Sequence, residues 1–124
     1  MEVPSFLARQ FYVAGSLRNT PQGFSLEAGN PMGAGTLVGI GRLAVDGQPI
    51  APEAVTALRE GASEPIRAVD VTRFHPIKVA KGDRVTLHVA GETLAPGEHR
   101  LEVELFELNL GALRFAISDP VAAA

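Results

Sequence analysis

The sequence has 124 residues, of which 46% are hydrophobic, and this length suits one domain with its own core. It contains no cysteine, which excludes disulfide bonds, thiol catalysis and cysteine-based zinc sites. The 11 Lys and Arg residues are scattered and outnumbered by 14 Asp and Glu residues, so the basic face that nucleic-acid binding requires is not expected.

The N-terminal residues Met1–Pro4 lack the charged start and apolar run of a signal peptide. No later segment reaches the roughly 18 apolar residues of a membrane span. We therefore expect a soluble, cytoplasmic protein with no membrane partner, folded as a single domain over residues 1–124. Residues 1–15 are expected to form an N-terminal strand or arm, and residues 120–124 a frayed tail.

Most segments between the glycines and prolines alternate apolar and polar residues, as half-buried strands do. In chain order, this pattern predicts strands at residues 24–27, 37–45, 48–50, 68–74, 84–90, 99–110 and 113–117. The strands at residues 84–90 and 99–110 are expected to be consecutive antiparallel strands. Asp46-Gly47 favours a type I′ turn before an edge strand with Pro49. In the segment 99–110 the apolar residues lie at odd positions up to Leu105 and at even positions after it, which predicts a β-bulge near Leu105.

Residues 52–61 predict the only helix, because Pro52 suits a first helical position and Gly61 a C-terminal cap. The whole pattern predicts an all-β fold. We expect a β-sandwich of about seven to eight short antiparallel strands, jelly-roll or Ig-like, with at most one short helix.

The glycine-rich stretch 33–39 does not fit a dinucleotide-binding fingerprint, because the third glycine comes one residue late and a strand follows instead of a helix. Such glycines more often enter a strand at a crowded position. Gly39 and Gly41 are therefore expected where another backbone or a bulky side chain approaches closely.

His75, His88 and His99 are the only histidines, and no two lie closer than 11 positions apart. A cupin-type metal site needs two histidines two residues apart on one strand, so we expect no metal site in this chain. His88 is expected to face solvent and His99 to lie in a turn.

Glu102, Glu104 and Glu107 raise the question of a carboxylate pair for glycoside hydrolysis. Glu102 and Glu104 share one face of a predicted strand, where the expected role is a solvated outer surface. A catalytic acid needs an apolar pocket that raises its pKa, and the pattern supplies none. A Gly-x-Ser-x-Gly nucleophile motif is also missing. We predict no catalytic and no cofactor-binding residue in this chain.

The segment from residue 30 to residue 37 is long, rich in small residues and poor in charge, which suits packing against another protein. We predict a partner interface there, and we expect an aromatic loop to line the partner's pocket. The predicted interface residues are Asn30, Pro31, Met32, Thr36 and Leu37 from the segment, and Phe74 and His75 from the loop.

Several short motifs in a fixed order resemble the small (β) subunit of bacterial C-glycoside deglycosidases, from about residue 16 to residue 119. The motifs are Ser16-Leu17-Arg18-Asn19, Gly23-Phe24, Asn30-Pro31, Gly35-Thr36-Leu37, Val45-Asp46-Gly47 and Pro96-Gly97-Glu98-His99.

The resemblance implies a β-sandwich bound to a larger TIM-barrel catalytic subunit that is similar to sugar isomerases. That subunit is expected to carry a divalent metal of the Mn or Mg class and the acid/base residues. The complex would act on 3-keto C-glycosides, in which the ketone acidifies the adjacent C–H and elimination breaks the C–C bond. The metal would polarise the ketone.

Three alternatives remain at this stage. A free-standing carbohydrate-binding module is the first, although such modules present aromatic platforms and this chain has no Trp and one Tyr. A small enzyme with a metal bound by the three histidines is the second. A structural or assembly protein without a ligand is the third.

Overall fold

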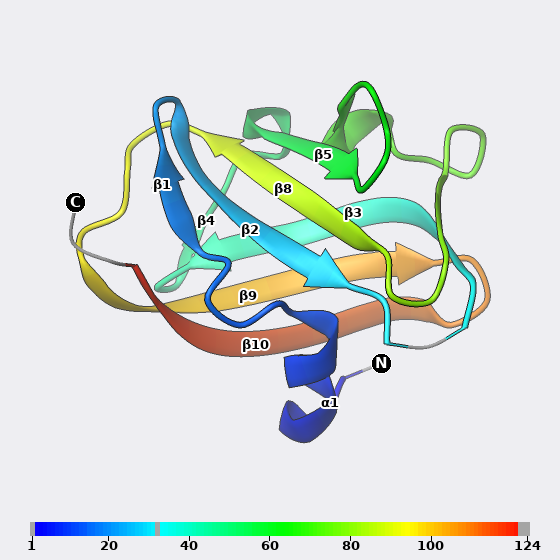
Figure 1. Ribbon diagram of the computed structural model, residues 1–124, viewed down its shortest axis with the longest axis horizontal. Helices are drawn as coiled ribbons and strands as arrows, with labels where there is room; N and C mark the ends of the chain where they lie inside the picture. Colours follow the sequence, from blue (N-terminus) through cyan, green and yellow to red (C-terminus); the bar gives the residue numbers. More distant parts are fainter. Residues whose placement is uncertain (1, 32, 122–124) are drawn as a thin grey trace.

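The computed structural model describes residues 2–31 and 33–121, so Met32 and the end of the predicted tail lie outside the described residues. Two antiparallel sheets face each other as a sandwich (Figure 1). The predicted all-β sandwich is thereby confirmed. In the part of the chain that the structure describes, no helix is long and apolar enough to cross a bilayer.

The first sheet has the order β1-β2-β8-β5-β6 and the second the order β10-β9-β3-β4, with β7 paired to β3. The first contains β1 (Arg18–Thr20), β2 (Gly23–Gly29), β8 (Arg84–Ala90), β5 (Val55–Arg59) and β6 (Ile66–Arg67). The second contains β10 (Gly111–Val121), β9 (Gly97–Glu107), β3 (Gly35–Val45), β4 (Gln48–Pro49) and β7 (Ile77–Val79).

The core lies between the sheets, and alternation along the strands selects its residues. In β8, Val85, Leu87 and Val89 are buried while the intervening side chains are half-buried or exposed. In β9, Leu101 and Leu105 are buried in the opposite sheet. Each such side chain contributes roughly 1.5–3 kcal/mol of hydrophobic stabilisation. The strand predicted at residues 84–90 is confirmed with its inward face.

The turn between β3 and β4 is also as predicted. Asp46 and Gly47 both have positive φ, 52° and 81°, as a type I′ turn requires. The short return strand β4 lies at the edge of its sheet. Pro49 has no backbone N–H, and at an edge this costs no hydrogen bond inside the sheet.

Two predicted elements are wrong. In place of a helix over residues 52–61, only Pro52–Ala54 forms a 3-10 turn (η1), and Val55–Arg59 is β5. Strand β5 pairs with β8 on one side and β6 on the other, and this pairing outweighs the local helix signals of Pro52 and Gly61. The strand predicted at residues 68–74 is a second 3-10 turn (η2, Ala68–Asp70) followed by a loop.

The last strands also differ in pairing from the prediction. Strands β8 and β9 belong to different sheets, so they are not antiparallel neighbours. Strand β9 pairs with β10 without interruption, so the predicted bulge near Leu105 is not in β9. The register shifts lie opposite it in β3, between Leu37 and Gly39 and between Ile40 and Leu43. Phe106 shares the outer face of the sheet with Glu104, over Gly39 and Gly41 of β3, and β9 ends at Glu107, so β9 needs no bulge.

The ends of the chain meet on β10. Residues 5–11 form a helix, α1 (Ser5–Phe11), where a strand or arm was expected. The Phe11 ring stacks on Phe115 of β10 at a centroid distance of 6.2 Å. Strand β10 continues through Pro120 to Val121, which is buried opposite Gly97, so it runs further than predicted. The N-terminal segment is therefore part of the folded core.

Candidate functional site

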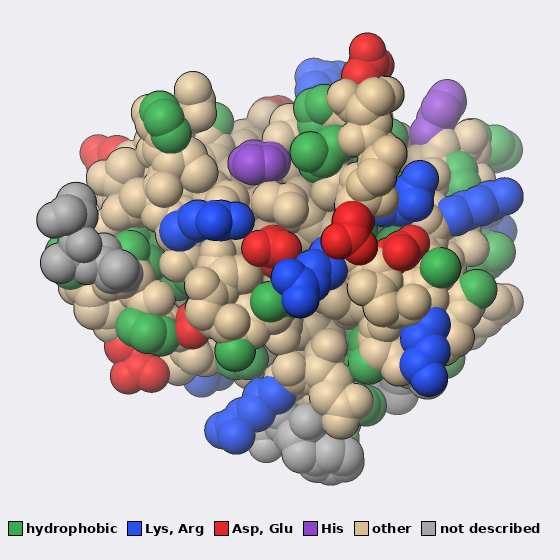
Figure 2. Space-filling model, viewed as in Figure 1, with side chains coloured by type: hydrophobic (Ala, Val, Ile, Leu, Met, Phe, Trp, Pro, Cys, Tyr) green, Lys and Arg blue, Asp and Glu red, His purple; other side chains and the backbone are tan. Residues whose placement is uncertain are grey.

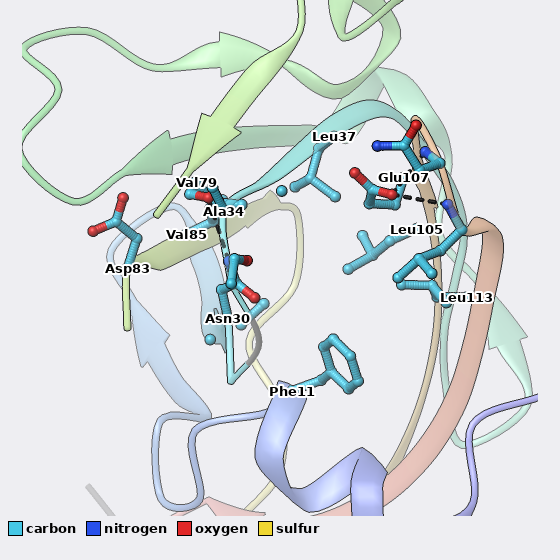
Figure 3. Close-up of a pocket in the computed structure, with 16 residues that line it drawn as sticks. Phe11, Asn30, Ala34, Leu37, Val79, Asp83, Val85, Leu105, Glu107 and Leu113 are labelled. Atoms are coloured by element: carbon cyan, nitrogen blue, oxygen red, sulfur yellow. Dashed lines mark hydrogen bonds between the residues drawn. The ribbon is translucent and has the colours of Figure 1, made fainter. Parts of the chain in front are cut away.

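A cavity of about 280 Å³ opens at the end of the sandwich that faces α1, near the lower end of the roughly 300–1,000 Å³ typical of ligand sites (Figure 3). Its walls come from both sheets, from α1, and from the turns between β2 and β3, β7 and β8, and β9 and β10. The lining residues are Phe11, Ala28, Gly29, Asn30, Gly33, Ala34, Gly35, Leu37, Val79, Asp83, Val85, Leu105, Glu107, Asn109, Leu110 and Leu113.

The apolar wall follows from strand alternation. Leu37, Leu105 and Leu113 are inward residues of β3, β9 and β10. Val85 is the inward residue that β8 contributes from the opposite sheet. Figure 3 shows Leu37, Leu105 and Leu113 pointing into one space, with the Phe11 ring entering it from α1. Among the described residues, no lysine or arginine lines the cavity.

Glu107 is the carboxylate of the cavity with the most local contacts. Its Oε2 accepts a hydrogen bond from the Thr36 N–H at 2.9 Å, and its Oε1 accepts the N–H groups of Asn109 and Leu110 at 2.8 Å each. Burial alone would raise the pKa of Glu107, but these N–H groups and that of Leu108 hold the pKa below its usual value. The side chain is therefore suited to holding its turn, not to donating a proton.

Asn30 holds the other side of the cavity mouth. Its side-chain amide donates to the carbonyl oxygens of Gly33, Val79 and Ala80 at 3.0, 3.3 and 3.2 Å. Its backbone carbonyl accepts the Gly82 N–H at 2.8 Å. These bonds join the β2–β3 loop to the turn between β7 and β8, so the mouth is bordered by fixed backbone.

Two exposed leucines flank the cavity. Leu108 is 48% exposed and Leu110 is 45% exposed, and both lie in the turn between β9 and β10. The Leu108 N–H donates to the Thr36 carbonyl oxygen at 2.9 Å, which fixes this turn against β3. We call the surface formed by Asn30, Thr36, Leu37, Leu108 and Leu110 around the cavity the apolar end.

The structure brings three of the predicted interface residues together. Asn30 and Leu37 line the cavity, and Thr36 is bonded to its Glu107. Pro31 is half-buried beside them, and Met32 lies outside the described residues. The leucines of the β9–β10 turn were missed because sequence alternation placed them inside a longer strand.

Phe74 and His75 lie on a different turn and are exposed. That turn leads directly into β7, whose Ile77 and Lys78 pair with Leu37 and Thr36 of β3. The pairing therefore connects the aromatic turn to the strand that carries the apolar end.

The broad face of the first sheet has a different character. Figure 2 shows acidic and basic side chains interspersed over the face in view, which Figure 1 identifies as that of β1, β2 and β8. Glu27 of β2 lies between Arg18 and Arg84, at 3.5 and 3.7 Å. Paired charges of this kind are typical of a solvated surface.

The three histidines do not build a metal centre. His88 is exposed on β8, as predicted, and His75 is exposed on its turn. His99 is buried in β9 and not in a turn, with Nδ1 2.6 Å from Asp46 Oδ2 and Nε2 2.7 Å from the Ala95 carbonyl oxygen. Among the described residues, no group of three His, Asp or Glu side chains is placed to hold a metal ion.

Glu102 and Glu104 are engaged in ion pairs on the outer face of the second sheet. Glu102 lies 3.5 Å from Arg42, and Glu104 accepts a hydrogen bond from Arg114 Nε at 2.5 Å. The Arg114 hydrogen bond, followed by the Arg42 N–H, holds the pKa of Glu104 below its usual value. A catalytic acid needs the opposite shift.

Gly39 and Gly41 occupy crowded positions on the same face, as the sequence predicted. A Cβ on Gly39 would lie 2.9 Å from Phe106, and one on Gly41 would lie 2.3 Å from Glu104 Oε1 and 2.8 Å from Phe106. The glycines of the 33–41 stretch therefore serve packing at these two positions, where Phe106 and Glu104 lie over β3.

No curated protein matches the sequence. A family model described as "Hydroxymethylglutaryl-CoA reductase, N-terminal domain" matches residues 7–122. The match begins within α1 and runs past the end of β10, so it includes all strands of both sheets and the whole apolar end. The chain therefore belongs to the family described as the N-terminal domain of hydroxymethylglutaryl-CoA reductase.

Proposed function

We propose that this chain is the small, non-catalytic subunit of a cytoplasmic C-glycoside deglycosidase. Its larger TIM-barrel partner would carry the divalent metal, of the Mn or Mg class, and cleave the C–C bond of 3-keto C-glycosides. The ordered motifs between residues 16 and 119 support the choice of enzyme. The apolar end carries the proposal, because Asn30 and Leu37 from the interface prediction line its cavity and the backbone N–H of Thr36 binds Glu107 of the same cavity.

The chemistry of the apolar end suits a protein partner. The partly exposed Leu108 and Leu110 stand beside a cavity with apolar walls, whereas the neighbouring sheet face carries ion pairs. The centre of a protein interface is apolar and depleted of charge, and its rim is polar. Covering these leucines would release their hydration water and contribute to binding.

The backbone around the apolar end is already fixed, which lowers the entropic cost of association. Glu107 binds the N–H groups of Thr36, Asn109 and Leu110, and Asn30 binds the β7–β8 turn. A partner would therefore meet backbone that is already hydrogen-bonded at Asn30, Thr36, Asn109 and Leu110.

The ion-paired state of Glu104 supports placing the acid/base groups in the partner. A carboxylate whose pKa is lowered by Arg114 and the Arg42 N–H is a poor proton donor at neutral pH. In the proposed division of labour, the metal of the large subunit would polarise the sugar ketone, and this chain would supply a docking surface for that subunit.

The test is a comparison of three samples: this chain, a candidate metal-bearing barrel subunit, and the two co-expressed. Each is incubated with a 3-keto C-glucoside, release of the aglycone is followed, and complex formation is measured by size exclusion. We expect cleavage only by the pair, which should elute as one complex. A barrel that is fully active alone and forms no complex with this chain would contradict the proposal.

The family match favours a second candidate, an accessory role beside the catalytic part of a hydroxymethylglutaryl-CoA reductase. The family description names a domain of that enzyme, and the apolar end would then pack against the reductase. The same co-expression is carried out with a reductase catalytic domain, and reduction of hydroxymethylglutaryl-CoA is followed. A stable complex with the reductase, and none with the barrel, would select this candidate.

A further inference from the structure

Phe74 is the most exposed large hydrophobic side chain among the described residues, at 88%. It lies between η2 and β7, outside both sheets. Because the ring is almost wholly exposed to water, the core gains nothing from its size. An aromatic ring in such a position is typical of residues that anchor a protein interface.

The turn that carries Phe74 is closed by hydrogen bonds. The Thr72 N–H donates to the His75 carbonyl oxygen at 3.3 Å, and the His75 N–H donates to the Thr72 carbonyl oxygen at 3.2 Å. Thr72 Oγ1 also accepts the N–H groups of Phe74 and His75, each at 3.2 Å. Arg73 and Phe74 therefore form the tip of a fixed four-residue turn. Fixing the backbone before binding lowers the entropic cost of inserting the ring.

The tip is basic. Arg73 is exposed, and none of the carboxylates in the described residues forms an ion pair with it. The nearby acidic side chain of Asp70 is already paired with Arg67 at 2.9 Å. His75 follows Phe74 and is also exposed. A partner surface that complements this tip would carry negative charge.

We propose that the Arg73-Phe74 tip is an anchor that inserts the Phe74 ring into an apolar pocket of the catalytic subunit, and that the rim of this pocket carries a carboxylate for Arg73. This inference rests on the proposed function and adds the chemistry of the partner's surface. The pairing of Leu37 with Ile77 connects the tip, through β7, to the strand of the apolar end. One partner would therefore contact both surfaces.

The test measures, by biolayer interferometry, the affinity of the purified chain for the barrel subunit, which is purified separately. Phe74→Ala should weaken binding about thirtyfold or more, the usual effect of removing an aromatic anchor. Its melting temperature should stay unchanged, since the ring makes few contacts in the isolated chain. Phe74→Leu should give an intermediate loss. Gln22→Ala, an exposed change in the distant β1–β2 turn, is the matched control and should bind as the wild type does.

Arg73→Glu tests the rim separately. We expect weaker binding than for Arg73→Ala, with a loss that shrinks as salt is raised. If the wild type binds and Phe74→Ala binds within twofold of it, the anchor is overturned while the proposed function stands. If Arg73→Glu binds as well as the wild type or better, the acidic rim is overturned. If the wild type forms no complex with the barrel, the proposed function fails and the anchor with it.

Discussion

The Glu107 carboxylate accepts a hydrogen bond from the Thr36 N–H at 2.9 Å, and this bond joins the end of β9 to the start of β3. The same carboxylate holds the turn that presents Leu108 and Leu110. Glu107 therefore maintains the shape of the apolar end although it needs no contact with a partner.

Replacing Glu107 with Ala should lower the free energy of unfolding by about 1–3 kcal/mol, because the backbone N–H groups lose their acceptor. The pKa of Glu107 in the folded chain lies below its ordinary 4.5, so its stabilisation is present above that pH. It should be lost as the pH falls through the folded pKa. Urea denaturation at pH 7 and at pH 3 measures both effects, and Glu92→Ala is the exposed control. An equal loss at both pH values would contradict this role.

Tyr12 should ionise only when the fold opens. Its O–H donates to buried Asp119, and burial, followed by this hydrogen bond, raises the pKa of Tyr12 far above its ordinary 10.0. Because the folded pKa is raised, the stabilisation is present below pH 10 and lost as the pH rises further. Tyr12 is the only tyrosine, so phenolate absorbance reports it alone. Absorbance and circular dichroism should change together; titration near pH 10 in a folded chain would refute this.

Tyr12→Phe keeps the ring and removes the donor to Asp119. The carboxylate retains the Gly15 and Leu17 N–H groups, at 3.1 and 3.4 Å, but loses its phenol. We expect the free energy of unfolding at pH 7 to fall by about 1–3 kcal/mol. Urea denaturation measures the change, and an unchanged midpoint would show that this tether is unimportant.

Gly41→Ala should destabilise the fold by about 1–3 kcal/mol. The added Cβ would meet Glu104 Oε1 at 2.3 Å, and Arg114 holds that carboxylate in place. Gly33→Ala is the matched control, since a Cβ there would meet no described atom within 4 Å beyond its chain neighbours. Thermal unfolding of the two variants distinguishes the effect of crowding at Gly41 from the general effect of replacing a glycine. Equal melting temperatures for the two variants would contradict the crowding.

His99 should stabilise the fold more below pH 6.5 than above it. The Ala95 carbonyl oxygen, and then the Asp46 carboxylate, raise the pKa of His99 above its ordinary 6.5. The stabilisation is therefore fully present below pH 6.5 and lost as the pH rises through the folded pKa. The difference in unfolding free energy between the wild type and His99→Gln should shrink from pH 5.5 to pH 8.5. A constant difference would mean that folding does not raise the pKa of His99.

The sequence was informative where one residue type has a strong local preference. The alternation of Val85, Leu87 and Val89 and the positive φ of Asp46 and Gly47 needed no knowledge of distant contacts. Residues 52–61 were misread because the helix signal there is local, while pairing of β5 with β8 and β6 is not. Long-range pairing of this kind leaves little trace in a single sequence.

The candidate site shows the same division. Loop composition identified Asn30 and Leu37, which line the cavity, and Thr36, whose backbone N–H binds Glu107. Leu108 and Leu110 were missed because the apolar pattern predicted that the strand continues to residue 110. In the structure the strand ends at Glu107, whose carboxylate binds the N–H groups of the turn that follows. The contact of His99 in β9 with Asp46, 53 residues away in the turn after β3, depends on the long-range pairing of β9 with β3.

The role of the apolar end as a docking surface is tested by sedimentation velocity of the barrel subunit co-expressed with the wild-type chain and with the Leu110→Asp variant. Leu110 is 45% exposed, so the aspartate should leave the isolated chain folded while placing a charge at the centre of the apolar end. We expect one stable complex for the wild type and separate subunits for Leu110→Asp, with Glu92→Ala behaving as the wild type. Equal complex formation by the wild type and Leu110→Asp would contradict the apolar end as the docking surface.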